Sequence, residues 1–548
     1  MVIKLDNTVP EVQSALAFGL LPENLPAPVS SRGICKSYEN SLTYLVTKDV
    51  RGSLSNYNMS KRGGQRRLFS IPHPTFVHDE MLFFTKHWDE LKAIFSRSPG
   101  SMSKPIFSSL GPRAVHITPH SELPRARLKA FSRFEYCAIT DVARCYPSIY
   151  THSIPWAING RVAAKNDMNK YSGQVFGNRL DFVVRQAQDG QTIGLPIGPD
   201  TSKLVAEVVL SSVDAAFLRR YKKRHPSYIR HVDDYWIGGD TLEECELHLQ
   251  NLRTALREHE LDINDLKTRI VPVNRLIGDT WPGDFEMQLK RSFGALHEYH
   301  GYDPVSTLAN IIDRASQEND DGIVKHALRV LDENKLWTHR WDILEHFLAH
   351  CAVHFPHSFD YIARVIVWRI RTEKAYDRNL WIGITSKVIQ RSSSLGRDSE
   401  SLWALWLARE LKLILSRSLT DSVVDHNGAL VLAFMAHMFS HGRTRDKDIG
   451  AKLAATVAGN PYSGVNWPLS LELNVLDIKG VDFKAYEGTE HVLKLLHEGG
   501  RSLVDWNAVP PTFVKEGGEL DDEPAFAIED FAFDYGDDLA EADQAEDA

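Results

Sequence analysis

Two adjacent carboxylates, Asp233 and Asp234, stand in the decapeptide RHVDDYWIGG, which spans residues 230–239. β-prone runs flank them on both sides, so the pattern predicts a hairpin with both acids at its tip. Like charges side by side repel, and removing them from water is tolerable only where cations bind. Mg²⁺ prefers carboxylate oxygens together with phosphates and water, and phosphoryl-transfer sites often hold two such ions. The pair therefore predicts a Mg²⁺ site, with Mn²⁺ as a substitute.

A third carboxylate should converge on this tip. The segment FEYCAITDV predicts a strand that ends at Asp141, and we expect this strand to lie beside the hairpin in one sheet. Residues 203–218, KLVAEVVLSSVDAAFL, predict a helix between the two. A capping box of Thr241 and Glu244 starts a second helix. The order strand, helix, two strands, helix, strand is that of a split βαβ sheet.

Four motifs follow one another along this region. They are Asp141 with Tyr146 five residues later, a Gly- and Pro-rich turn at 191–202, the Asp-Asp hairpin at 231–234, and a later Lys267. In this order and spacing they resemble the palm motifs of reverse transcriptases. Any one of them alone would be weak evidence, because an isolated Asp-Asp turn is usually a solvated loop. The resemblance implies an RNA-directed DNA polymerase-like nucleotidyltransferase.

The resemblance also implies roles for individual residues. The implied metal ligands are Asp141, Val142, Asp233 and Asp234, of which the three aspartates are catalytic. The expected substrate-binding residues are Tyr146, Gly194, Pro196, Gly198, Lys267 and Arg67. The aromatic ring of Tyr146 would lie under the sugar of the incoming nucleotide and exclude a 2′-hydroxyl, so the substrates would be deoxynucleoside triphosphates. Gly194 and Gly198 would let the backbone approach the template or nucleotide, and the side chains of Lys267 and Arg67 would bind phosphate.

Ordinary structural roles remain open for several of these residues. Tyr146 could pack as a core aromatic, and Lys267 and Arg67 could be solvated surface charges. His346, His350 and His354 fall on one face of a predicted helix, where a metal site competes with a simple amphipathic rim.

The rest of the chain divides by composition. Residues 1–80 are irregular and carry a basic cluster, and we expect an N-terminal extension and the start of the fingers there. Fingers and palm would occupy 81–290. In 291–515 strand signals nearly vanish and helical segments recur, which favours stacked helix pairs similar to HEAT repeats. Residues 516–548 contain many acids and no Lys or Arg, which predicts a disordered tail, with docking to a basic partner as the alternative.

Two further stretches narrow the resemblance. LLPENLPAPVSSRGICKSY (20–38) and ITDVARCYPSIYTHSIPWAINGR (139–161) are similar to the abortive-infection and related defence-associated reverse transcriptases of bacteria, the AbiK-like polymerases. The implied fold class is an α+β reverse-transcriptase fingers-and-palm domain followed by an all-α domain of HEAT-like repeats. Members make DNA primed from their own side chain or use a noncoding RNA, and often form homo-oligomers. Candidate priming residues are Tyr38, Tyr44, Tyr57 and Tyr535.

Two other functions compete with this one. The chain could be a conventional RNA-templated reverse transcriptase of a mobile element, or a catalytically silent, oligomeric RNA-binding scaffold. The sequence has a net charge of -9, no long apolar run and five scattered cysteines without a Cys-x-x-Cys pair. We therefore expect a cytoplasmic protein with no membrane partner, no disulfide framework and no zinc site.

Overall fold

The computed structural model describes residues 10–108, 113–222, 224–276, 281–293, 303–334, 336–338, 340–457, 459–483 and 491–508. The predicted acidic tail at 516–548 lies outside them. In this part of the chain no helix is both long and apolar enough to cross a membrane.

The palm is a four-stranded antiparallel sheet. Its strands are β5 (Tyr136–Asp141), β6 (Tyr228–His231), β7 (Asp234–Gly239) and β8 (Arg269–Pro272). They lie in the order β6-β7-β5-β8. Helix α9 (Asp200–Arg219) connects the first two, and α10 (Leu242–Arg257) precedes β8. This is the predicted split βαβ arrangement, which is therefore confirmed.

Helix α9 is buried on nearly every side. The sequence predicted one apolar face, but the charged Glu207 and Asp214 are also 4% and 0% exposed. Both are paired with Arg230 of β6, which is fully buried. The helix is thus a central support of the palm, held by apolar packing and by a closed ionic network.

The region between residues 10 and 200 contains the segments predicted as N-terminal extension and fingers. Its remaining elements are α1 (Val12–Phe18), β1 (Ser55–Ser60), β2 (Arg66–Ile71), α2 (Pro74–Lys86), α3 (Trp88–Phe95), β3 (Ile106–Phe107), β4 (Val115–His116), α4 (Leu123–Phe131), α5 (Cys145–Ser148), α6 (Ser153–Asn159), α7 (Arg161–Asn166) and α8 (Gly177–Ala187). The expectation that residues 1–80 are irregular was wrong for 55–71, because β1 and β2 pair as an antiparallel hairpin. Its turn uses Gly63 and Gly64 at φ of 68° and 72°.

Beyond residue 281, every regular element in the described ranges is a helix. They are α11 (Trp281–Phe293), α13 (Pro304–Gln317), α14 (Gly322–Glu333), α15 (Trp341–His354), α16 (Phe359–Arg371), α17 (Arg378–Ser394), α18 (Asp398–Glu410), α19 (Arg417–His426), α20 (Ala429–Ser440), α21 (Ile449–Val457), α22 (Trp467–Val475) and α23 (His491–Glu498). The predicted loss of strands is confirmed. A HEAT-like repeat arrangement stays a prediction.

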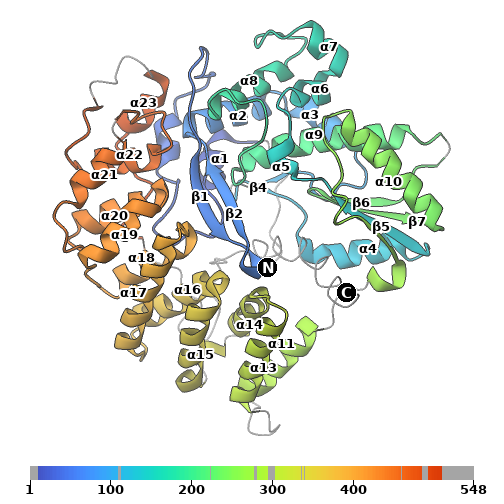
Figure 1. Ribbon diagram of the computed structural model, residues 1–548. Helices are drawn as coiled ribbons and strands as arrows, with labels where there is room; N and C mark the ends of the chain where they lie inside the picture. The colour runs from blue at the N-terminus through green and yellow to red at the C-terminus, as the bar shows by residue number, and fades with distance from the viewer. Residues whose placement is uncertain are drawn as a thin grey trace.

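The helical region wraps around the β1–β2 hairpin. Figure 1 shows α11 to α23 in an arc on one side of the hairpin and the palm sheet with α10 on the other. Leu16, Leu20, Tyr38 and Tyr57 from the N-terminal part share one apolar core with the helical region, whereas palm and fingers have a second core. The N-terminal segment therefore contributes side chains to an apolar core and connects the palm side of the molecule with the helical region.

Candidate active site

Three aspartates meet at the end of the palm sheet. Asp141, the last residue of β5, stands directly opposite Asp234, the first residue of β7. Asp233 forms the turn beside it, and its carbonyl oxygen accepts a hydrogen bond from the backbone of Val142 at 3.1 Å. Asp141 is 7% exposed. The prediction that the strand ending at Asp141 lies beside the hairpin is confirmed, since opposed residues of paired strands have their Cβ atoms about 5 Å apart.

The hairpin tip is held in a strained conformation. Val232 has φ of 54°, a left-handed value that a β-branched side chain strongly disfavours. Its N–H donates to Ser103 Oγ at 2.6 Å, and its carbonyl accepts from Arg230 Nη1 at 3.0 Å. Arg230 is in turn fixed by Glu207 and Asp214, each at 2.8 Å. This support fixes where the two acids point.

Sequence reasoning missed this support. The signals were present, because Arg230 interrupts a β-prone run and Glu207 interrupts the apolar run of the predicted helix. Burying an unpaired charge at a core position of a strand or helix costs free energy. The presence of Arg230 in one element and Glu207 in the other therefore indicates that the two charges pair.

Lys267 is brought to the first aspartate. Its Nζ lies 3.3 Å from Asp141 Oδ2. The segment before it runs along the end of β5, where Asn264 N–H donates to the carbonyl of Asp141 at 2.9 Å and Val142 bridges to Ile263. The predicted lysine is thus part of the carboxylate site, beside Asp141. Its role in the reaction stays a prediction.

Tyr146 and the Gly- and Pro-rich turn form a neighbouring unit. The Tyr146 carbonyl accepts from Leu195 N–H at 2.8 Å, which ties the turn to the segment after β5. Gly194 and Gly198 have φ of 95° and 128°, so both positions need glycine. Burial raises the pKa of the Tyr146 phenol well above its usual value, and Cys145 and Asp233 reinforce this. The side chain is therefore a neutral phenol at physiological pH.

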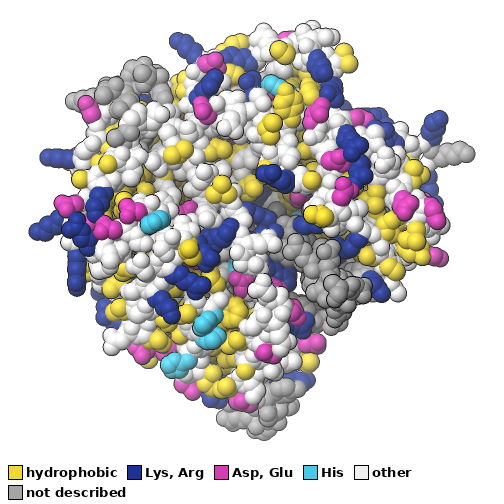
Figure 2. Space-filling view, viewed as in Figure 1, with side chains coloured by type: hydrophobic (Ala, Val, Ile, Leu, Met, Phe, Trp, Pro, Cys, Tyr) yellow, Lys and Arg dark blue, Asp and Glu magenta, His cyan; other side chains and the backbone are white. Residues whose placement is uncertain are grey.

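A cavity of about 350 Å³ opens at these residues. Of the predicted site residues, Asp233, Asp234, Tyr146, Gly198 and Arg67 line it. Figure 2 shows Lys and Arg side chains around a hollow near the centre of one face, between the palm and the helical region. A cavity of this size is in the range of small-molecule sites.

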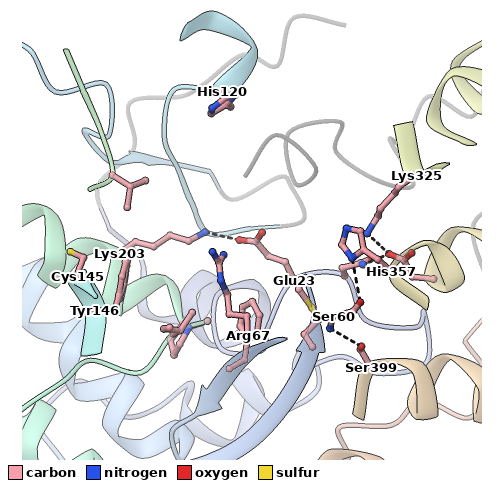
Figure 3. Close-up of a pocket in the computed structure, with 18 of the residues that line it drawn as sticks. Glu23, Ser60, Arg67, His120, Cys145, Tyr146, Lys203, Lys325, His357 and Ser399 are labelled. Atoms are coloured by element: carbon pink, nitrogen blue, oxygen red, sulfur yellow. Dashed lines mark hydrogen bonds and ion pairs between the residues drawn. The ribbon is translucent and has the colours of Figure 1, made fainter. Parts of the chain in front are cut away.

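The cavity has three walls from distant parts of the sequence. One is the palm tip, one is the β1–β2 hairpin with the preceding Glu23 and Asn24, and the third is helical. The helical wall consists of Lys325, Pro356, His357, Phe359, Asp360, Ser399, Glu400 and Trp403. Figure 3 shows labelled side chains of all three walls facing the same space. The sequence located the palm wall and Arg67, but gave no pattern that joins the helical wall to them.

The remaining predicted residues support this cavity from outside its lining. Asp141, Val142 and Lys267 do not line the cavity. Strand pairing places Asp141 and Val142 beside Asp234 and Asp233, and the ion pair with Asp141 holds Lys267 next to them. Gly194 and Pro196 are inside the turn that carries Gly198, and Pro196 is buried. The structure therefore gathers all the predicted site residues around one region of the palm.

The donor set suits a hard divalent cation. Carboxylate oxygens are the protein ligands that Mg²⁺ prefers, and it commonly takes one or two of them with substrate phosphates and water. Within the described residues, no three side chains of His, Cys, Asp or Glu stand close enough to hold a metal unaided. This applies equally to His346, His350 and His354. The aspartates fit Mg²⁺ by donor type, and a bound substrate would have to complete the coordination.

Three of the candidate priming tyrosines can be placed. Tyr38 and Tyr57 are fully buried, and Tyr38 is hydrogen-bonded to Thr75 at 3.1 Å. Tyr44 is partly buried with the Arg179 guanidinium 4.2 Å above its ring. None of the three is among the residues that line the cavity as described. Tyr535 lies outside the described residues.

Comparisons with known proteins give only distant likenesses. No family model matches the sequence, and no curated protein matches it. Among solved structures, apo telomerase from Candida tropicalis is 11% identical with a TM-score of 0.30, over 79% of this chain and 74% of that chain. Telomerase from Candida albicans with a TWJ fragment of telomeric RNA is 12% identical with a TM-score of 0.28, over 68% and 67%.

A C-terminally truncated apo telomerase from Candida tropicalis is 13% identical with a TM-score of 0.27. Here the match spans 41% of this chain and only half of the telomerase chain. These scores are too low to carry an argument, so function has to be inferred from the residues of this chain.

Proposed function

We propose that the chain is a cytoplasmic DNA polymerase of reverse-transcriptase type that joins deoxynucleotides by two-metal nucleotidyl transfer. One observation carries the proposal: Asp141 stands opposite Asp234 on adjacent strands, with Asp233 at the tip between them, at the mouth of a nucleotide-sized cavity. Paired carboxylates beside a cation-lined cavity are the arrangement that phosphoryl transfer needs.

Each wall residue then has a defined task. Asp141, Asp233 and Asp234 would hold the divalent cations, with Val142 as the further ligand that the resemblance implies. A cation bound there supplies charge neutralisation for the triphosphate and lowers the pKa of the attacking hydroxyl. Tyr146, a neutral phenol, packs below the sugar and leaves no room for a 2′-hydroxyl.

The cationic residues orient the phosphates. Arg67 projects from β2 into the cavity and can bind a phosphate in a bidentate manner. Lys267, whose Nζ lies 3.3 Å from Asp141 Oδ2, would shield the charge of the carboxylates and donate a proton to the leaving pyrophosphate.

The wider biology rests on the sequence resemblance. We assign the enzyme to bacterial anti-phage defence, acting as a homo-oligomer, with synthesis primed by one of its own side chains. It would work either without a template or with an associated noncoding RNA. Because Tyr38 and Tyr57 are fully buried, priming from either would require the N-terminal segment to open. Tyr44 is the more accessible of the placed candidates.

The test is incorporation of each labelled deoxynucleotide by purified, nuclease-treated protein with Mg²⁺ or Mn²⁺. Products are resolved on a denaturing gel with and without protease, beside Asp233→Ala. Label that stays with wild-type protein until protease frees it, and is absent from the variant, supports self-primed synthesis. Synthesis only after addition of an RNA template and primer supports the mobile-element alternative. Intact phage defence in Asp233→Ala bacteria would favour the silent scaffold.

A further inference from the structure

A partly buried acid already occupies the cationic side of the cavity. Glu23, in the segment after α1, places Oε1 2.7 Å from Lys203 Nζ and 3.6 Å from Arg113 Nε. Glu23 and Lys203 both line the cavity, and their side chains are 18% and 20% exposed. In Figure 3 this ion pair crosses the cavity, and the Arg67 guanidinium points toward it.

Glu23 is an anion under all ordinary conditions. Burial alone would raise its pKa, but Lys203 and Arg113 outweigh that and hold the pKa of Glu23 at about 2. Arg113 has other fixed partners, namely Asp200 Oδ1 at 3.0 Å and the carbonyls of Leu21 and Gly198 at 2.7 and 2.9 Å. It is therefore structural. Lys203 has a second anion as well, because its Nζ lies 3.3 Å from Asp200 Oδ1, but unlike Arg113 it lines the cavity and is the cation that a ligand there can reach.

Lys203 is well placed to meet a phosphate. It is on α9 directly after the Gly- and Pro-rich turn, and it lines the cavity together with Tyr146, Asp233 and Arg67. A nucleotide with its sugar at Tyr146 and its metal-bound phosphates at Asp233 would bring its triphosphate to the same wall. A carboxylate and a phosphate oxygen compete for an ammonium group in the same geometry.

The residue after Glu23 anchors it to the opposite wall. Asn24 has φ of 60° and hydrogen-bonds Asp360 and Arg364 of α16. Its carbonyl also accepts from Trp403 Nε1 of α18 at 3.2 Å. The Glu23–Asn24 crosspiece thus spans the cavity from palm to helical region. Its backbone is anchored through Asn24, so a ligand that takes the place of the Glu23 carboxylate has only to turn the Glu23 side chain aside.

We propose that Lys203 is a phosphate-binding residue of the nucleotide site and that Glu23 is a built-in competitor, which the triphosphate displaces when a nucleotide enters. This rests on the proposed function for the choice of ligand. The inference goes beyond the proposed function because it names a second phosphate-binding cation, on helix α9, and an internal anion that sets the affinity for the nucleotide.

The test is equilibrium binding of each of the four deoxynucleoside triphosphates, and of inorganic tripolyphosphate, to full-length protein in metal-free buffer, where no turnover occurs. Glu23→Gln keeps the shape and hydrogen bonding of the side chain and removes its charge. It should bind roughly tenfold more tightly than wild type, the factor that about 1.4 kcal/mol of charge-assisted contact represents. Lys203→Met should bind roughly tenfold more weakly. Glu39→Gln makes the same charge change at an exposed position nearby and should leave affinity unchanged.

Equal triphosphate affinities for wild type and Glu23→Gln would overturn the proposal that Glu23 competes with the ligand. An unchanged affinity in Lys203→Met would overturn the proposal that Lys203 binds phosphate, and with it the competition. Lys203→Arg, which keeps the charge, should bind within a few-fold of wild type and guards against a folding defect in the methionine variant. If wild type incorporates nucleotides and Glu23→Gln has the same triphosphate affinity as wild type, the role of Glu23 as a competitor is rejected and the polymerase proposal is retained. Tighter binding in Glu23→Gln by a protein that incorporates nothing supports the competitor and rejects the polymerase. Absence of triphosphate binding in every variant rejects the competitor.

Discussion

Replacing Arg230 by methionine should loosen the hairpin that carries Asp233 and Asp234, the proposed catalytic residues. The guanidinium is fully buried and bonds Glu207, Asp214 and the carbonyl of Val232 at 2.8 to 3.0 Å. Methionine fills much of the same volume but leaves two buried carboxylates without their cation. Breaking a buried ion pair from one side typically costs about 3–5 kcal/mol. The strained Val232 loses a holding contact in addition.

Hydrogen–deuterium exchange in peptides covering residues 225–240 measures this loss locally. A lowered opening free energy of that size speeds exchange roughly a hundredfold or more. Arg125→Met is the matched control, because that side chain is 86% exposed. Adding Glu207→Gln and Asp214→Asn to Arg230→Met should recover part of the protection, since no buried charge is then left unpaired. Exchange within fivefold of wild type in Arg230→Met alone would refute the reasoning.

Three more outcomes follow from single side chains. Tyr146→Ala should raise ribonucleotide use relative to deoxynucleotide by roughly tenfold or more, measured as a ratio of kcat/KM values. Gly198→Ala should lower stability by about 1–3 kcal/mol in urea unfolding, because φ is 128° and a Cβ would lie 3.1 Å from Phe69. Burial raises the pKa of Glu80 from 4.5 to about 7, so its stabilising protonation is complete below pH 4.5 and is lost as pH rises through 7. Glu80→Gln should therefore equal wild type near pH 4.5 and exceed it by about 3 kcal/mol at pH 8.

The palm could be predicted from the sequence because its signals are local. Asp141 ends a short β-prone run, and the Asp-Asp pair is flanked by two more, so the strands and the hairpin follow from local pattern. The pairing of β5 with β7, which brings the acids together, was an expectation that the structure confirms, whereas the spatial order of the four strands was not predicted. The capping box at Thr241 is equally local, and Glu244 N–H does donate to its hydroxyl at 3.2 Å. Such features depend on neighbours a few residues apart and need no knowledge of the rest of the chain.

The β1–β2 hairpin could not be predicted in this way. Its sequence, SNYNMS and RRLFSI around a Gly-Gly turn, is mostly polar and shows no clean alternation. A two-stranded hairpin is marginal by itself in water, so this one forms because the helical region holds it. Helix α17 depends on its neighbours in a similar way: its segment, RNLWIGITSKVIQRSSS, is rich in β-branched residues and serine, and it is stabilised by packing on α15, α18 and α19.

This dependence has a consequence for the proposed reaction. The hairpin backbone at Asn58 donates to Asp398 Oδ2 at 2.8 Å, and Arg66 pairs with Glu400 at 2.6 Å, both acids being on α18. At the turn, Arg62 and Asp320 form a buried pair. Arg67, one residue from Arg66, therefore owes its position to α18, more than 300 residues later in the chain, and to Asp320 before α14. The helical region is thus part of the proposed nucleotide site, because it supplies one wall of the cavity, holds the crosspiece through Asn24 and fixes the strand that presents Arg67.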